Sequence, residues 1–192
     1  VQSTEKMTKN NLFDNIYHEH FNYWSLTTLI NFFNNLNLTV YKFKEVDTHG
    51  GSLRLYVAKN RKIDNSVKNY LLKEANSNLD KKETFDNFSK NIEEEKKNVI
   101  LNLKKLIKNK KNVMFYGAPA KATTLLNYFN IDSKDIQYVI EDNRLKVGKY
   151  IPNTGIKIID KEQALMHNPE VIIVLAWNFF ERIKKSNESI FP

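Results

Sequence analysis

In the first part of the chain, apolar residues are spaced first as in a helix and then as in β-strands. From Leu26 onward apolar residues recur at helical spacing, and Ser25 precedes them as a candidate N-cap. Residues 38–46 are rich in β-branched and aromatic side chains, and alternate apolar residues return at 53–57. The pattern predicts one helix and a β-hairpin. These are too few elements for an independent core, so residues 1–60 are interpreted as the end of a larger sheet.

The middle of the chain, residues 61–111, has a helical pattern throughout. Its apolar residues follow a period close to seven and are flanked by lysines and glutamates. This stripe consists of Phe85, Phe88, Ile92, Val99, Leu103 and Leu106. It predicts a long connecting helix packed on the body of the protein, with a short coiled-coil contact as the alternative. The charged run 93–97 predicts a solvated helix face.

The last part of the chain alternates short apolar runs with helical segments. Strands are expected at 113–116, 136–140, 156–158 and 171–175, and helices at 121–129, 161–166 and 179–185. Apolar strands separated by helices predict an α/β fold, a small parallel Rossmann-like sheet with flanking helices. Ligands of such sheets bind beyond the carboxyl ends of the strands, which here are residues 117–121, 141–143 and 176–178.

Composition narrows the class of protein. The sequence has 192 residues, 41% of them apolar, with no apolar run long enough to cross a bilayer. Cysteine is absent, which excludes disulfides and thiolate metal sites, and the start of the chain lacks a signal peptide, so a cytoplasmic location is expected. The formal charge of +8 favours anionic partners. Nucleic acid is not expected, because the lysines are mixed with glutamates and no zinc-finger, KH or RRM signature accompanies them.

A short segment before the first predicted helix concentrates groups that transfer protons near neutral pH. Tyr17, His18, Glu19 and His20 follow one another. One interpretation is that an imidazole acts as a base and is oriented by the carboxylate or the phenol. In a weaker metal-site interpretation, the two histidines share a face of an extended segment while Glu19 points away. The third interpretation is that the histidines only make structural hydrogen bonds. No metal site is predicted.

Two glycine-containing loops are candidates for binding an anion. In the segment His49-Gly50-Gly51-Ser52-Leu53-Arg54, the guanidinium of Arg54 suits a phosphate or carboxylate, although the segment also reads as an ordinary hairpin loop. The segment Gly117-Ala118-Pro119-Ala120-Lys121 presents backbone amides and a lysine at the start of a helix. It is neither a Walker loop nor a dinucleotide fingerprint, and simple helix capping is the alternative.

The motifs, taken in order, resemble one family. They are Phe13-Asp14-x-Ile16-Tyr17-His18-Glu19-His20-x-x-Tyr23, then His49–Arg54, then Gly117–Lys121 with the following Thr-Leu-Leu-Asn-Tyr, and then Trp177-Asn178. Together they resemble the S-adenosylmethionine-dependent sugar C-methyltransferases over nearly the whole chain.

The resemblance implies an activity and a domain organisation. The family adds a methyl group to carbon 3 of a nucleotide-linked 4-keto-6-deoxy sugar, and it has a zinc-binding N-terminal module, a methyltransferase domain and a Rossmann-like C-terminal domain. For this chain it implies the last helix and β-hairpin of the methyltransferase domain over 1–60. A helical connector over 61–111 and the Rossmann-like domain over 112–192 would follow.

The resemblance also implies roles for individual residues. His20 is expected to be the base that removes the proton next to the ketone and forms an enolate, with Glu19 and Tyr17 orienting or stabilising it. Lys121 and its loop are expected to face the nucleotide-diphosphate sugar. The expected substrate-binding residues are Lys121, Gly117, Ala118, Pro119, Asn178, His49 and Arg54.

The departures from the family pattern are equally informative. The zinc cysteines, the glycine-rich S-adenosylmethionine loop and an initiating Met are missing, so we expect a C-terminal fragment that is inactive alone. Its cofactor site would lie mostly in the missing N-terminal portion. Ala122 and Asn153 stand where the family usually has glycine. The alternative is a non-catalytic module that binds a nucleotide sugar or docks to a separate methyltransferase subunit. A nicotinamide-dependent dehydrogenase is disfavoured by the missing fingerprint.

Overall fold

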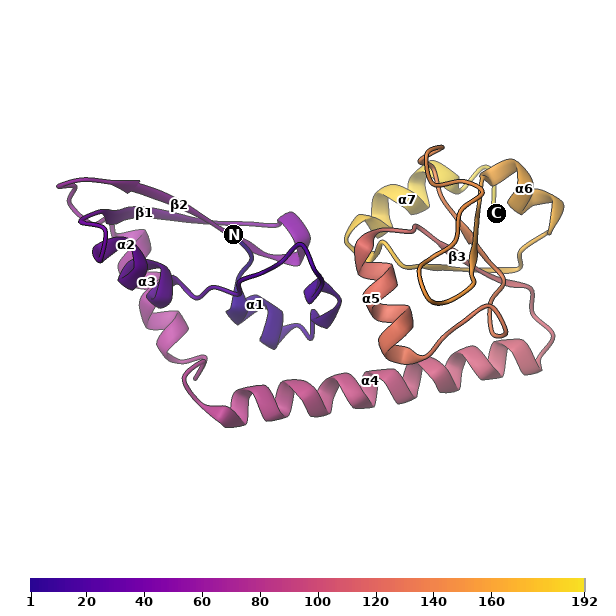
Figure 1. Ribbon diagram of the computed structural model, residues 1–192, viewed down its shortest axis with the longest axis horizontal. Coiled ribbons are helices and arrows are strands. Elements are labelled where there is room, and N and C mark those ends of the chain that lie inside the picture. Colours follow the sequence, from indigo (N-terminus) through magenta and orange to yellow (C-terminus); the bar gives the residue numbers. More distant parts are fainter. Residues whose placement is uncertain (192) are drawn as a thin grey trace. The chain divides into compact units, whose positions relative to one another are not determined.

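The computed structural model describes residues 1–191, apart from the side chain of His49, and the chain forms two compact units. The first unit is Val1–Glu93 and the second is Glu94–Pro192. Figure 1 shows the order of the elements in each unit. The first unit contains α1 (Thr4–Lys9), the 3-10 turn η1 (Phe13–Asn15), α2 (Leu26–Asn34), β1 (Thr39–Val46), the 3-10 turn η2 (Thr48–Gly50), β2 (Ser52–Ala58), α3 (Asn65–Ala75) and the first part of α4 (Lys82–Lys108).

The hairpin β1–β2 and two helices enclose the core of the first unit. The strands pair antiparallel with a bulge between Val40 and Lys42, and α2 and α3 pack on β1. The core residues are Leu26, Leu29, Val40, Phe43, Leu53, Val67 and Tyr70. The last two belong to α3, in the stretch interpreted from the sequence as a connector. The three-part division of the chain remains a prediction.

The start of α2 is capped twice. Ser25 forms a capping box with Thr28, as its position in the sequence predicts. In addition, the buried carboxylate of Glu74 on α3 accepts hydrogen bonds from the backbone N–H groups of Leu26 at 2.6 Å and Thr27 at 2.8 Å. A carboxylate at a helix N-terminus satisfies unpaired donors and complements the helix dipole. Glu74 therefore joins α3 to α2.

The first residues of the chain lie along β2. The N–H of Leu53 donates to the carbonyl of Val1 at 2.7 Å, and the N–H of Ser3 donates to that of Gly51 at 3.2 Å. On the other side, the N–H of Thr4 donates to the carbonyl of Trp24 at 3.0 Å. The extended segment Val1–Ser3 is thus held between β2 and the residues before α2.

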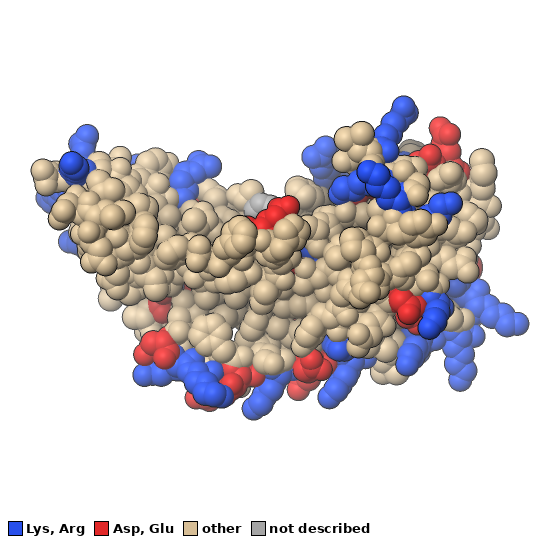
Figure 2. All heavy atoms as spheres, in the orientation of Figure 1, with Lys and Arg blue, Asp and Glu red and all other residues tan. Residues whose placement is uncertain are grey.

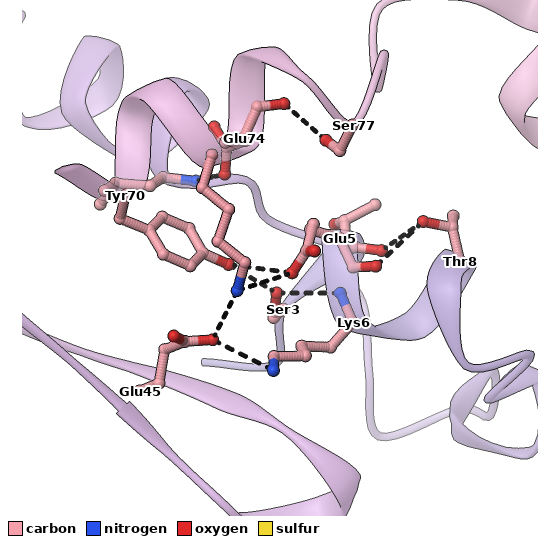
Figure 3. Close-up of polar contacts among 11 residues, drawn as sticks. Ser3, Glu5, Lys6, Thr8, Glu45, Tyr70, Glu74 and Ser77 are labelled. Atoms are coloured by element: carbon pink, nitrogen blue, oxygen red, sulfur yellow. Dashed lines mark hydrogen bonds and ion pairs between the residues drawn. The ribbon is translucent and has the colours of Figure 1, made fainter. Parts of the chain in front are cut away.

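A network of charged and hydroxyl groups attaches α1 to β1 and α3 (Figure 3). Glu45 on β1 contacts the ammonium groups of Lys6 at 3.2 Å and Lys73 at 3.3 Å. The buried carboxylate of Glu5 accepts a hydrogen bond from the hydroxyl of Tyr70 at 3.4 Å. Burial raises the pKa of Tyr70, so its hydroxyl stays protonated and donates. The network holds α1 against β1 and α3. The sequence pattern did not predict a helix at these residues.

The helical stretch predicted at 61–111 is broken in the structure. Between α3 and α4 the residues 76–81 form turns, with Asn78 at a left-handed φ of 51°. Along α4, Phe88, Ile92 and Leu103 of the predicted stripe are buried. Phe85 and Val99 of the same stripe are exposed, so the stripe is covered only in part. Basic and acidic side chains are interspersed along the exposed surface of α4, as the lower edge of Figure 2 shows, which agrees with the predicted solvated face.

The second unit is an α/β domain with the predicted parallel sheet. Its elements are β3 (Val113–Tyr116), α5 (Ala120–Phe129), β4 (Tyr138–Ile140), β5 (Lys157–Ile159), α6 (Lys161–Met166), β6 (Val171–Val174), the 3-10 turn η3 (Trp177–Phe179) and α7 (Phe180–Asn187). The strands lie in the order β5-β4-β3-β6, and every neighbouring pair is parallel. The fold class predicted from the sequence is confirmed.

Helices cover both faces of this sheet. The connection through α5 and the connection through α6 run in opposite directions along the sheet, so right-handed crossovers place these helices on opposite faces. Figure 1 shows α5 on one side of the strands and α6 and α7 on the other. Met114 and Tyr116 of β3 pack with Ala164 of α6 and Ile183 of α7. Among residues 1–191, no helix has both the length and the hydrophobicity needed to span a bilayer.

Candidate functional site

A cleft of about 820 Å³ in the first unit contains three of the predicted site residues. It is called the His20 cleft below. His20 and Glu19 line it from the segment before α2, and Arg54 lines it from β2. Much of the remaining wall is apolar and comes from α2 and β2, including Leu29, Phe33, Leu53, Leu55 and Val57. This volume lies in the range of small-molecule sites, and the mixture of an apolar wall with a few polar groups is typical of them.

The imidazole of His20 has a defined tautomer when neutral. Its Nδ1 lies 2.7 Å from the backbone carbonyl oxygen of Asn15. A carbonyl oxygen only accepts, so Nδ1 carries the hydrogen and donates it. The lone pair of the neutral ring is then on Nε2, the nitrogen able to take up a proton. The carbonyl belongs to the last residue of η1, and sequence reasoning did not find this contact.

Tyr17 packs against His20. The two ring centroids are 4.3 Å apart, and the planes are tilted by 38°. Burial, followed by the negative charges of Glu19 and Asp14, raises the pKa of the Tyr17 phenol. Tyr17 is therefore a hydrogen-bond donor at neutral pH and is unsuited to act as a base.

The segment around the histidines turns instead of running extended. The N–H of His20 donates to the carbonyl of Tyr17 at 2.9 Å, which closes a turn. The geometry that would place His18 and His20 on one face of an extended strand is therefore absent. The His18 side chain is 85% exposed, and its Nε2 lies 4.0 Å from a carboxylate oxygen of Glu19. Arg54 is exposed where it lines the cleft, whereas the side chain of His49 lies outside the described part of the structure.

In the second unit, the predicted loop Gly117–Lys121 lies at the point where the strand order reverses. The chain leaves β3 toward β4 and later returns to β6 on the other side of β3. Such switch points form the ligand crevices of open parallel sheets. Here the two loops approach closely: Gly117 has a φ of 89°, and a Cβ on it would lie 2.8 Å from the Cβ of Ala176.

Lys121 is buried under Trp177. The residue is 5% exposed, and its Nζ lies 4.7 Å from the centroid of the Trp177 ring. An ammonium over an indole face is a favourable cation–π contact. The structure thus brings Lys121 next to the predicted segment Trp177-Asn178, with Asn178 half-buried in η3. These contacts place the lysine beneath the ring, and its expected role in facing a ligand stays a prediction.

The backbone of the same loop is partly occupied by its own unit. The N–H of Ala118 donates to the carboxylate of Glu141 at 2.9 Å, and its carbonyl accepts from Lys146 at 2.8 Å. Pro119 is the N-cap residue of α5 and makes no side-chain capping bond. The sequence predicted unoccupied amides in this loop, and that of Ala118 is taken by a carboxylate. A bound anion would have to displace Glu141 or use the later amides of the turn.

A polar network lies beside this loop at the ends of β3 and β4. The hydroxyl of Tyr116 donates to the carboxylate of Asp142 at 2.9 Å, and Lys161 pairs with the same carboxylate at 2.9 Å. Burial raises the pKa of Tyr116. Burial acts to lower the pKa of Lys161, but the contacts with Asp142 and Tyr116 outweigh it and raise that pKa. A cleft of about 560 Å³, lined by Glu141, Asp142, Arg144, Val147, Asp160, Lys161 and Glu162, adjoins the network.

The two positions where the sequence departs from the family's glycines behave differently. Asn153 has a φ of 60°, in the left-handed region that glycine and asparagine occupy most readily, so this replacement preserves the turn. Ala122 is buried within α5, where an alanine is a good helix former.

Comparison with known proteins identifies the family. The family described as the C-methyltransferase C-terminal domain matches residues 47–191. This match covers most of the chain. The chain belongs to this family.

One C-methyltransferase relative shows how much of a complete protein the chain represents. The C-methyltransferase NovU of Streptomyces niveus is 31% identical over 181 residues, which cover 93% of this chain. They cover 43% of the NovU sequence, so the chain spans less than half of that relative. The resemblance stated from the motifs is confirmed at the level of the family.

Proposed function

We propose that this chain is the C-terminal part of an S-adenosylmethionine-dependent C-methyltransferase that acts on a nucleotide-linked keto-deoxysugar, with His20 as the base. The observation that carries the proposal is the 2.7 Å contact between His20 Nδ1 and the Asn15 carbonyl, in a residue that lines a cleft of about 820 Å³. Membership of the C-methyltransferase family supports the reaction type.

The proposed chemistry begins with removal of a proton. His20 Nε2 takes the proton from the carbon next to the ketone, and the electrons of that C–H bond move onto the ketone oxygen to give an enolate. The protonated phenol of Tyr17 and the guanidinium of Arg54 are suited to stabilise negative charge. When bound, S-adenosylmethionine would supply a methyl group on a positively charged sulfur; the enolate carbon would accept this methyl as its bond to sulfur breaks, with neutral S-adenosylhomocysteine as the leaving group. His20 then releases its proton to solvent.

We infer that the site for the methyl donor lies mostly outside this chain. The sequence has no glycine-rich loop after an early strand, the feature that brings backbone close to such a cofactor. The donor site is therefore proposed to lie in a part of the protein that precedes this chain, in agreement with the match to a C-terminal domain and with the 43% of NovU that the match covers. In the second unit, the loop Gly117–Lys121 with Asn178 is proposed to contact the nucleotide-sugar, after rearrangement of Lys121 from beneath Trp177.

The test of the base uses the chain joined to an N-terminal portion of the kind NovU has. Exchange of the hydrogen next to the ketone with deuterium from solvent is followed by mass spectrometry, with the uridine- and thymidine-diphosphate 4-keto-6-deoxyhexoses. We expect His20→Ala to slow the exchange by about 10²–10⁴-fold, the usual contribution of a positioned base. His18→Ala is the matched control, since His18 is exposed, and we expect it to exchange at the wild-type rate. Unchanged exchange in His20→Ala would remove His20 from the role.

A non-catalytic binding module is the second candidate. It is favoured by the coverage of less than half of NovU and by the match to a C-terminal domain. A thermal-shift titration of this chain with the same nucleotide sugars separates the candidates. Binding by the chain, with no exchange in the joined protein, would support the module and exclude the enzyme.

A further inference from the structure

The two edges of the hairpin β1–β2 are covered to different extents. At the edge of β1, the carbonyl of Tyr41 accepts a hydrogen bond from the N–H of Asp64 at 2.8 Å. At the same edge, the N–H of Phe43 donates to the hydroxyl of Ser66 at 3.2 Å. The start of α3 and the residue before it therefore cover this edge, and no further strand is needed there.

The edge of β2 is covered only at its beginning. The N–H of Leu53 donates to the carbonyl of Val1 at 2.7 Å, and the amino group of Val1 donates to the carbonyl of Leu53 at 3.0 Å. Backbone groups of alternate strand residues point to the same edge, so those of Leu55 and Val57 point away from β1 as those of Leu53 do. In the part of the chain that the structure describes, no segment pairs with them on that side.

The side chains beside this edge show that water alone does not complete it. Leu55 and Val57 are partly buried against the core of the first unit, and with Leu29 and Phe33 of α2 they form the apolar wall of the His20 cleft. Native edge strands that stay exposed are protected by proline or by charge. Residues 55–58 are Leu-Tyr-Val-Ala and have neither protection. An apolar strand edge that continues into an apolar wall fits a further strand.

We propose that the segment preceding Val1 in the longer protein forms a strand antiparallel to β2, pairs with Leu55 and Val57, and closes the apolar end of the His20 cleft. The occupant follows from continuity, because Val1–Ser3 already lies antiparallel to β2 and its direct extension runs along the open edge. The match covers 43% of NovU, so a protein of that kind has the additional chain that such a strand requires.

The register specifies which residues of the segment enter the cleft. Val1 lies opposite Leu53, so the residues second and fourth before Val1 lie opposite Leu55 and Val57. Residues directly opposite in a sheet share a face, so these two side chains pack toward Phe33 and are apolar. They leave the polar end of the cleft, with His20, for a ligand. The pairing itself is independent of any role of His20 in catalysis.

Amide hydrogen exchange, resolved by residue, tests the pairing in the chain alone and in the joined protein. We expect exchange at Leu55 and Val57 to be fast in the chain and about 100-fold or more slower in the joined protein. Arg54 and Tyr56, whose backbone groups face β1, are the internal control and should be protected in both proteins. Equal exchange rates at Leu55 and Val57 in the two proteins would overturn the proposal, as would charged residues at both register positions before Val1.

A proline variant tests the same edge by a second measurement. Val57→Pro removes an N–H that points to solvent in the chain alone, where an edge strand tolerates it, but removes a bond of the new pair in the joined protein. We expect the melting temperature of the joined protein to fall more than that of the chain. Tyr56→Pro removes an N–H that faces β1 and should lower both melting temperatures. An equal effect of Val57→Pro on the two proteins would contradict the pairing.

Discussion

The charge of Glu45 on the hairpin contacts two helices. Its carboxylate contacts Lys6 of α1, as Figure 3 shows, and also Lys73 of α3. Partial burial acts to raise the pKa of Glu45, but the hydrogen bonds and charges of the two lysines outweigh it, so the pKa lies below its ordinary value of 4.5. A carboxyl whose pKa is lowered by folding stabilises the folded state only while it is ionised.

Glu45→Gln should therefore lower stability in a pH-dependent way. Above about pH 4.5 the wild-type contact is fully present, and as the pH falls through the lower folded-state pKa it is lost. We expect the variant to be less stable by about 1 kcal/mol or less at neutral pH, because the site is partly exposed to solvent. The difference should vanish in acid, as measured by urea unfolding across the pH range. Glu94→Gln, on the exposed face of α4, should show no such trend, and a constant deficit in Glu45→Gln would contradict the explanation.

At the scale of elements, the chain segments that follow β3 and β6 pack closely against each other. Gly117 follows β3 with a φ of 89°, and Ala176 lies after β6, so close that a Cβ on Gly117 would be 2.8 Å from the Ala176 Cβ. Gly148 has a similar φ of 84°, but nothing lies within 4 Å of its Cβ position. The two glycines share the cost of backbone conformation and differ in the steric cost.

Gly117→Ala should consequently destabilise the second unit more than Gly148→Ala. The backbone conformation alone costs about 1–2 kcal/mol for a residue with a side chain, and this should be the whole effect at Gly148. The clash at Gly117 should add about 1–3 kcal/mol, as overpacking does. Combining Gly117→Ala with Ala176→Gly should recover the added part in urea unfolding. Equal losses in the two single variants would show that the strand ends separate freely.

The sequence predicts contacts within an element better than contacts between elements. The strand at 113–116 and the helix at 161–166 lie where the local pattern places them, and Ser25 caps the helix that follows it. The break at 76–81 also has a local signal, a cluster of asparagine, serine and aspartate residues, but the helical period of the surrounding residues outweighed it.

Contacts between residues far apart in the sequence have no local sequence signal. The bond from Leu26 to Glu74 spans 48 residues and depends on how α3 packs, which no local pattern encodes. At the candidate site, the sequence indicated His20 and Lys121 by residue type. It did not reveal that the Asn15 carbonyl fixes the tautomer of His20, or that Lys121 is buried beneath Trp177. Both follow from turns whose geometry is set by packing.

At the scale of the whole molecule, the two units are proposed to supply different parts of the reaction. The first unit holds the candidate base in a cleft, and the second holds a parallel sheet whose switch-point loops are candidates for the nucleotide-sugar. Neither unit has a glycine-rich loop in its sequence that would bring backbone to a methyl donor. Because the match covers 43% of NovU, the proposed donor site is expected in the part of such a protein that this chain does not represent.

This division predicts that the chain alone does not bind S-adenosylmethionine. Isothermal titration calorimetry should show no heat of binding with the chain, and binding at micromolar donor once it is joined to an N-terminal portion of the kind NovU has. In the joined protein, His20→Ala should bind the donor as the wild type does while losing exchange next to the ketone, since base and donor site would belong to different parts of the chain. Micromolar binding of the donor to the chain alone would contradict the division. It would require a donor site built from the residues of these two units, and the His20 cleft, at about 820 Å³, would then be the place to look for it.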